Sequence, residues 1–125
     1  MEPSDFIVNG ISKIDSCKKS CYFEGDFNNI TLVFEEEINS CEYMFNGSGY
    51  IRIIDLSKFD TSKVTNMRYM FNGCEYLEKI KFGNINTSLV NNMENMFYNC
   101  KKLQSLNLST FNTSLLTDMT RMFYA

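Results

Sequence analysis

The segment Thr61-Ser62-Lys63-Val64-Thr65-Asn66-Met67-Arg68-Tyr69-Met70-Phe71-Asn72-Gly73 has close counterparts before and after it in the chain. Its Met-Phe pair recurs at a step of 26 residues, as Met44-Phe45, Met70-Phe71, Met96-Phe97 and Met122-Phe123. The same step relates Val64 to Val90 and Leu116, Met67 to Met93 and Met119, and Thr61-Ser62 to Thr87-Ser88 and Thr113-Ser114. Self-similarity at a period of about 20 to 50 residues is typical of stacked repeats, in which no unit buries its apolar face alone. The sequence therefore predicts a repeat array.

Within residues 61–86 the pattern predicts one helix followed by one strand. Thr61 and Ser62 are residue types that cap a helix N-terminus. The apolar residues that follow have the spacing of one helical face: Val64, Met67, Met70 and Phe71. Asn72-Gly73 then tolerates the left-handed backbone with which many helices end. The next apolar residues, Leu77, Ile80 and Phe82, indicate a short strand.

We therefore expect an α/β solenoid: a leucine-rich-repeat-like, right-handed coil with one short parallel strand and one helix per 26-residue repeat. Like strands would form a parallel sheet on one face, with the helices on the other. The array would occupy residues 38–125, as repeats 38–63, 64–89 and 90–115 and a partial repeat 116–125. Because the chain ends within a fourth repeat, we expect it to be the N-terminal portion of a longer array.

The first 37 residues do not fit the 26-residue period. Ile30, Leu32 and Phe34 alternate with other residues in the manner of a strand. We expect residues 1–37 to form an N-terminal capping segment that covers the first strand and the first helix of the array. Met1-Glu2-Pro3-Ser4-Asp5 lacks the basic start and apolar core of a secretory signal.

The composition argues against catalysis and against polyanionic partners. Histidine is absent, which removes the commonest general base and a frequent metal ligand. The formal net charge is −3, whereas nucleic acids and anionic membranes favour clustered Lys and Arg. No apolar run reaches the about 18 residues that a membrane-spanning helix needs. We expect a protein that is not an enzyme, with no cofactor, no metal site, no nucleic-acid partner and no membrane span.

The cysteines leave several pairings open. Cys74 and Cys100 share one repeat position, so they are either small buried residues in adjacent coils or partners in a disulfide. If the protein is exported, Cys17 or Cys21 can pair with Cys41. Cys17-x-x-x-Cys21 is also half of a metal site, a weak signal without histidine or a second close pair.

The outward side of the expected sheet is the candidate binding surface. If the apolar strand residues point inward, a period of two turns six others outward: Ile53, Asp55, Lys79, Lys81, Ser105 and Asn107. Solenoids bind partners on such an extended concave face, and the mixed charge favours a protein or glycan ligand. The alternative is that these are ordinary solvated strand positions.

Residues Leu56-Ser57-Lys58-Phe59-Asp60-Thr61-Ser62-Lys63-Val64-Thr65-Asn66-Met67, continuing to Met70-Phe71-Asn72-Gly73-Cys74, closely resemble the BspA-like leucine-rich repeat family. The segment Leu106-Asn107-Leu108-Ser109-Thr110-Phe111-Asn112-Thr113-Ser114 repeats the match, and the resemblance covers about residues 38–125. It implies surface proteins of bacteria and protists, some of them adhesins for host matrix proteins or other cells. This sequence departs from the pattern at Cys41, Ser48-Gly49 and Gly83.

The leading functional hypothesis is a non-catalytic protein-binding or adhesion module at the cell surface or outside the cell, with a protein, glycoprotein or extracellular-matrix ligand. The rival is a structural unit that self-assembles, for example as a homodimer, through the open edge at residues 103–108 and an apolar surface on the fourth repeat. That surface comprises Leu116, Met119, Met122 and Phe123. A cytoplasmic scaffold is the third hypothesis.

Overall fold

The computed structural model describes residues 5–8, 11–12, 30–33 and 37–125. The chain divides into two compact units, Met1–Glu37 and Ile38–Ala125. In the first unit, β1 (Asp5–Val8) pairs antiparallel with both β2 (Ile11–Ser12) and β3 (Ile30–Val33). The strand expected at Ile30 and Leu32 is confirmed, while Phe34 lies outside the described residues. The capping role of this unit stays a prediction.

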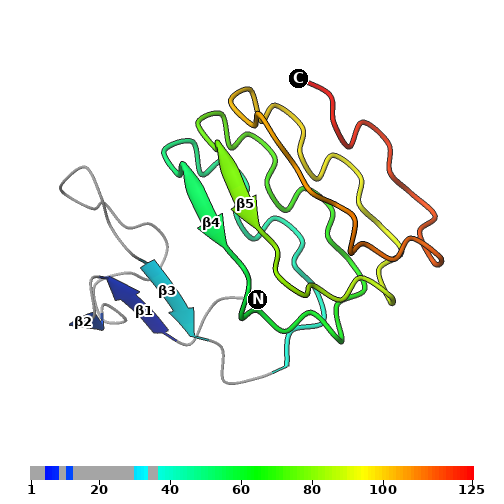
Figure 1. The fold of residues 1–125 in the computed structure, drawn as a ribbon, viewed down its shortest axis with the longest axis horizontal. Helices are drawn as coiled ribbons and strands as arrows, with labels where there is room; N and C mark the ends of the chain where they lie inside the picture. Colours follow the sequence, from blue (N-terminus) through cyan, green and yellow to red (C-terminus); the bar gives the residue numbers. More distant parts are fainter. Residues whose placement is uncertain (1–4, 9–10, 13–29, 34–36) are drawn as a thin grey trace. The chain divides into compact units, whose positions relative to one another are not determined.

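The second unit is built from coils stacked one after another (Figure 1). Pairings between neighbouring coils join residues that are 26 positions apart. Two of the coils carry short strands, β4 (Ile53–Asp55) and β5 (Lys79–Lys81), which pair in parallel and in register. Isolated parallel bridges keep the same step elsewhere in the coils, joining Ser40 to Asn66, Asn66 to Asn92 and Asn92 to Asp118. The repeat period in the sequence is thus the stacking period of the structure.

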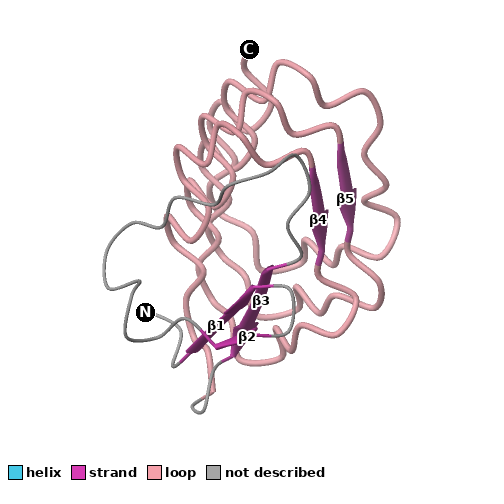
Figure 2. Cartoon of the chain, turned by 90° about the vertical axis from the view of Figure 1, so that its left-hand side faces the viewer, coloured by secondary structure: helices cyan, strands magenta, loops and turns pink. Residues whose placement is uncertain are grey.

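The expected α/β solenoid with a helix in each repeat is wrong. The described part of the chain contains no helix, only strands, turns and irregular segments (Figure 2). In the segment where the second repeat was expected to be helical, Tyr69 and Gly73 have φ angles of 56° and 71°. This left-handed backbone cannot be part of a right-handed α-helix. The same conformation recurs one repeat earlier, at Tyr43 and Gly47.

Backbone hydrogen bonds explain why turns replace the helix. Met67, Tyr69 and Phe71 donate their N–H groups to carbonyls of the next coil, over 2.9 to 3.0 Å. The residues between them close short turns within their own coil, as when the Met70 N–H donates to the Met67 carbonyl. A chain of three-residue turns places residues three apart on one side, as a helix does. The apolar spacing that indicated a helix therefore fits both structures.

Two threonines expected to cap helices instead join neighbouring coils. The Thr61 hydroxyl donates to the carbonyl of Asn86, over 2.8 Å, and accepts the N–H of the same residue, over 2.9 Å. Thr87 makes the same two bonds to Asn112, over 2.9 and 2.7 Å. Both threonine side chains are buried. Each hydroxyl thus donates one hydrogen bond to, and accepts one from, the backbone of a single residue in the following coil.

The parallel sheet is also smaller than expected. Residues 103–108, which correspond to β5 in the third coil, do not form a strand. The core nevertheless follows the repeat, because Met70, Met96 and Met122 are all buried. Alongside them, Phe45, Phe71, Phe97 and Phe123 stack ring on ring at centroid separations of 5.5 to 5.7 Å.

Candidate functional site

The outward side of β4 and β5 brings together four of the six predicted binding residues. Each strand buries its middle residue and exposes the two residues that flank it. The parallel register then places Ile53 beside Lys79 and Asp55 beside Lys81. We call this set of four exposed residues the strand face.

A charge pair organises one end of the strand face. The Lys81 Nζ atom lies 3.1 Å from the Asp55 Oδ2 atom, and the Ser57 N–H donates to Asp55 Oδ1 over 3.0 Å. Hydrogen bonds from Ser57, followed by the interaction with Lys81, lower the pKa of Asp55 to about 2. Asp55 therefore keeps its negative charge at neutral pH.

The other two predicted binding residues lie outside the paired strands. Ser105 and Asn107 are exposed, as expected, but they belong to the segment that does not extend the sheet beyond β5. The Asn107 Oδ1 atom accepts the N–H of Ser109, over 3.0 Å. No strand register fixes these side chains beside Lys79 and Lys81, so they are not part of the strand face.

Two pairs just before the strands extend the exposed surface and were missed in the sequence. The rings of Tyr50 and Tyr76 stack with centroids 6.5 Å apart, and Tyr50 is 96% exposed. Arg52 and Glu78 form an ion pair in which the Nη1–Oε1 distance is 3.5 Å. Both pairs keep the 26-residue step, so the recurrence of tyrosine and the opposite charges were the signals that could have found them.

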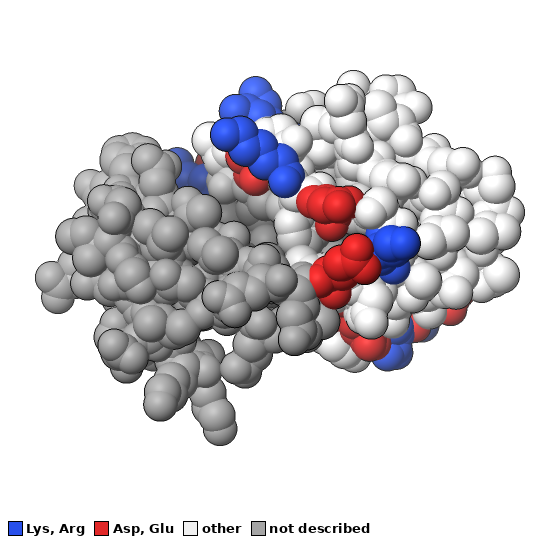
Figure 3. Space-filling view, turned by 90° about the horizontal axis from the view of Figure 1, so that it is seen from below, with Lys and Arg blue, Asp and Glu red and all other residues white. Residues whose placement is uncertain are grey.

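Ion pairs between coils set the charge pattern of the surface. Within the described residues each pair joins positions that are 26 residues apart: Arg52–Glu78, Arg68–Glu42, Arg68–Glu94, Lys81–Asp55 and Lys101–Glu75. Acidic and basic side chains are accordingly interspersed on the face seen in Figure 3. Such a surface creates no extended field of one sign, the feature that attracts polyanions.

Arg68 is the centre of a column of charges that spans three coils. Its Nε atom lies 2.6 Å from Glu94 Oε2, its Nη1 atom lies 3.2 Å from Glu42 Oε1, and its guanidinium carbon lies 4.6 Å from the ring centre of Tyr69. The hydrogen bond to Glu94 is the main reason why the pKa of Arg68 is raised. A permanently charged, doubly paired arginine aligns neighbouring repeats, so we assign Arg68 a structural role.

The sequence of these stacked coils matches a known family model. A family model described as "Mycoplasma protein of unknown function, DUF285" matches residues 26–125. The chain belongs to this family. Comparisons with curated proteins and with solved structures found no match. The DUF285 match covers all of the stacked coils, whereas the more specific resemblance to BspA-like leucine-rich repeat proteins stays a prediction.

The C-terminal surface of the DUF285 stack is partly buried. Met119 and Phe123 are each 56% exposed, and Leu116 is partly exposed. Met122 is buried instead, and its carbonyl accepts the N–H of Phe97 over 2.9 Å. A second chain could therefore reach Met119 and Phe123, but Met122 belongs to the core.

The described cysteines are buried free thiols. Cys74 donates its thiol to the carbonyl of Phe45 and Cys100 donates to that of Phe71, both over 3.1 Å. The disulfide considered between Cys74 and Cys100 is therefore absent. Burial is the main cause that raises the pKa of Cys41 and Cys74 to about 12 and that of Cys100 to about 11. Cys41 is free as well, so the disulfide considered between it and Cys17 or Cys21 is absent from this structure; Cys17 and Cys21 themselves lie outside the described residues.

In the described part of the chain, no group of three or more Cys, Asp or Glu side chains could hold a metal ion. That part of the chain also has no helix long and apolar enough to span a membrane.

Proposed function

We propose that this chain is a non-catalytic protein-binding or adhesion module of a cell-surface protein, and that it binds through the strand face. The observation that carries the proposal is the arrangement of Ile53, which is 61% exposed, beside charged residues of both signs. Protein interfaces commonly combine an apolar centre with a polar rim. Paired strands hold these side chains in place, which reduces the entropy lost on binding.

The interspersed charges favour a protein ligand, including a glycoprotein or a component of the extracellular matrix. A partner with both signs of charge can match the strand face, whereas a polyanion would meet Asp55 as well as Lys79 and Lys81. Tyr50 and Tyr76 provide exposed aromatic area, which is enriched at interfaces. The cell-surface location and the adhesive role rest on the resemblance to BspA-like proteins.

The test is binding to a panel of immobilised matrix proteins, namely fibronectin, laminin and collagen, measured by surface plasmon resonance. We expect saturable binding to at least one of them and an at least tenfold loss of affinity in the double variant Lys79→Glu, Lys81→Glu. The matched control is Lys58→Glu, Lys102→Glu, which makes the same charge change at exposed residues outside the strands. Absence of binding, or equal losses in both variants, would contradict the proposal.

The second candidate function is a self-assembling structural unit. It is favoured by the exposure of Met119 and Phe123 on the last coil, because exposed apolar patches are common at interfaces between chains. Light scattering across a concentration series separates the candidates. Ordered polymers or dimers that disappear in Met119→Ser, Phe123→Ser would favour assembly, whereas a monomer at every concentration would exclude it.

A further inference from the structure

One charge on the strand face has no counter-charge. Arg52 pairs with Glu78 just before the strands, and Lys81 pairs with Asp55 on the face itself. Lys79 lies along β5 between the residues of these two ion pairs, and it forms no ion pair within the described residues. Its ammonium group is therefore a free positive charge between two neutralised pairs.

The neighbours of Lys79 in the stack explain why it is unpaired. Every ion pair of the described residues joins positions that are 26 residues apart. At that step Lys79 has Ile53 before it and Ser105 after it, and neither residue is acidic. Ile53 is 61% exposed and lies beside Lys79 in the register of β4 and β5. The strand face thus presents a free ammonium group beside an exposed aliphatic side chain.

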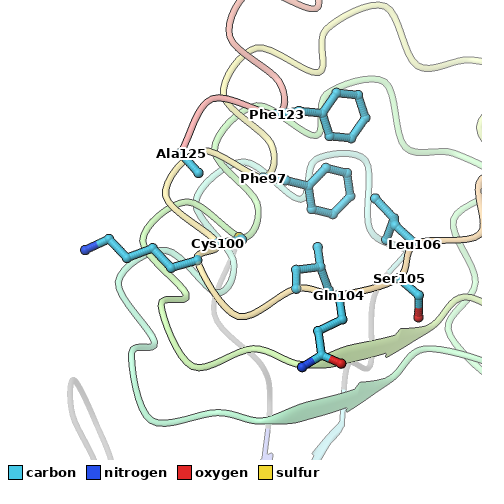
Figure 4. A pocket seen from close by; sticks show the side chains of 9 residues that line it. Phe97, Cys100, Gln104, Ser105, Leu106, Phe123 and Ala125 are labelled. Atoms are coloured by element: carbon cyan, nitrogen blue, oxygen red, sulfur yellow. The ribbon is translucent and has the colours of Figure 1, made fainter.

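This part of the strand face lies on the side of the stack and not at an end of it. Lys79 belongs to the second coil, with coils before and after it (Figure 1). No residue of the strand face lines the pocket of about 340 Å³ in the last coils, where Phe97 and Phe123 lie one above the other (Figure 4). The exposure of Lys79 is therefore a property of the sheet surface.

The charge around Lys79 has the opposite sign to that of the whole chain. Three basic and two acidic side chains lie on and just before the strands, namely Arg52, Lys79, Lys81, Asp55 and Glu78, whereas the net charge of the chain is −3. An acidic group on a partner is therefore attracted to this surface more than to the rest of the molecule, which orients the encounter. A carboxylate shifted along the strands would meet Asp55 or Glu78, and such repulsion disfavours a wrong register.

We propose that Lys79 binds a carboxylate of a partner protein, and that Ile53 packs against an apolar side chain next to this carboxylate. The inference rests on the proposed function, because it names the chemistry that the strand face would recognise. An apolar contact that excludes water lowers the local dielectric and strengthens the adjacent ion pair. Lys79 would thereby set the specificity, while the burial of Ile53 would add affinity.

Single variants separate the two roles in binding to immobilised fibronectin, laminin and collagen, measured by surface plasmon resonance at low and high salt. Lys79→Met should lower the affinity at least tenfold and reduce its dependence on salt, because the screened charge is gone. Ile53→Ser should also lower the affinity at least tenfold but keep the salt dependence. The control is Lys58→Met, which removes another exposed lysine without an ion pair in the described part of the chain and should change neither quantity.

Removing the neighbouring ion pair as a whole tests whether the free charge is the one that matters. Asp55→Asn with Lys81→Met leaves the net charge of the strand face unchanged and keeps a side-chain oxygen for the Ser57 N–H. We expect this double variant to lose several-fold less affinity than Lys79→Met. Equal losses would overturn the inference. Melting curves check that every variant is folded, which the exposure of these side chains favours.

The outcomes distinguish this inference from the proposed function. If none of the three matrix proteins binds, both fail. If one of them binds and Lys79→Met has the affinity of Lys58→Met, the inference alone fails, even where the reversal of both strand-face lysines abolishes binding. Tighter, Lys79-dependent binding to heparin would show that the partner is a polyanion and would also overturn it.

Discussion

Phe71 and Phe97 stack with ring centroids 5.5 Å apart and ring planes only 4° from parallel. They come from consecutive repeats, and Phe82 packs edge-on against both of them, at 6.4 and 6.5 Å. Aromatic pairs at these separations stabilise a core beyond the area that they bury. Each repeat therefore depends on its neighbours for its core, as in other stacked-repeat proteins.

The stacking of Phe97 between neighbouring rings predicts a large loss of stability for Phe97→Ala. The side chain is 2% exposed and contacts rings on both sides, so its truncation should cost about 3–5 kcal/mol of unfolding free energy. Phe123→Ala, which removes the same ring where it is 56% exposed, should cost markedly less. Urea denaturation measures both. A loss below about 1 kcal/mol in Phe97→Ala would place this ring outside the core.

The hydroxyl of Thr87 should matter more than its methyl group. Thr87→Val keeps the shape but leaves both the N–H and the carbonyl of Asn112 without their partner in the preceding coil. We expect a loss of about 0.5–1.5 kcal/mol for each of these two part-buried hydrogen bonds, the usual net contribution of an intramolecular hydrogen bond. Thr113→Val makes the same change at an exposed position of the next repeat and should alter stability by less than about 0.5 kcal/mol. Equal effects of the two variants would argue against the proposed role of the hydroxyl.

The repeat period was readable in the sequence because stacking places like residues over one another. Met70 and Met96 are both buried, and the side chains of the strand face point outward as the alternation predicts. Charge pairs such as Asp55 with Lys81 follow the same step. The burial, the outward orientation and the charge pairs could be predicted because they depend only on the type and the spacing of the side chains.

The sequence alone could not show that turns replace the expected helix, because those turns depend on hydrogen bonds between neighbouring coils. Apolar residues such as Met67 and Met70 have the same spacing in a helix and in consecutive turns. The distinguishing feature is the left-handed backbone at Tyr69 and Arg121, residue types that rarely adopt it without tertiary support. Bonds such as that from the Tyr69 N–H to the Glu94 carbonyl provide this support, and they form only after the coils stack.

Gly83 is a position where only glycine fits. Its φ angle is 59°, and an added Cβ atom would lie 2.7 Å from the Ser57 Cα atom of the preceding coil. Gly83→Ala should therefore cost at least about 1–2 kcal/mol from the left-handed backbone alone, and the contact adds to this cost. Gly49→Ala is the control, since the nearest atom to its Cβ would lie 3.9 Å away. Thermal unfolding should show a lower melting temperature for Gly83→Ala and little change for Gly49→Ala; a reversed order would contradict the close approach of the two coils.

The last prediction concerns acid pH and Asp55. Its pKa in the folded protein is about 2, below the ordinary value of 3.8. Because folding lowers this pKa, the carboxylate contributes stability that is present above pH 3.8 and is lost as the pH falls toward 2. Asp55→Asn should therefore flatten the decrease in melting temperature over this pH range, and it should do so more than Glu78→Gln, which changes an exposed carboxylate one residue before β5.

Site-resolved titration by NMR identifies the cause of this shift. Hydrogen bonds from Ser57 lower the pKa of Asp55 most, and the interaction with Lys81 contributes less. Ser57→Ala should therefore raise the pKa of Asp55 more than Lys81→Met does. Asp60→Asn serves as the control, because Asp60 is held by Ser62 and should leave the titration of Asp55 unchanged. Ser57→Ala keeps the backbone N–H bond to Asp55, so a larger rise in Lys81→Met would show that the ion pair across β4 and β5 lowers this pKa more than the Ser57 hydroxyl does.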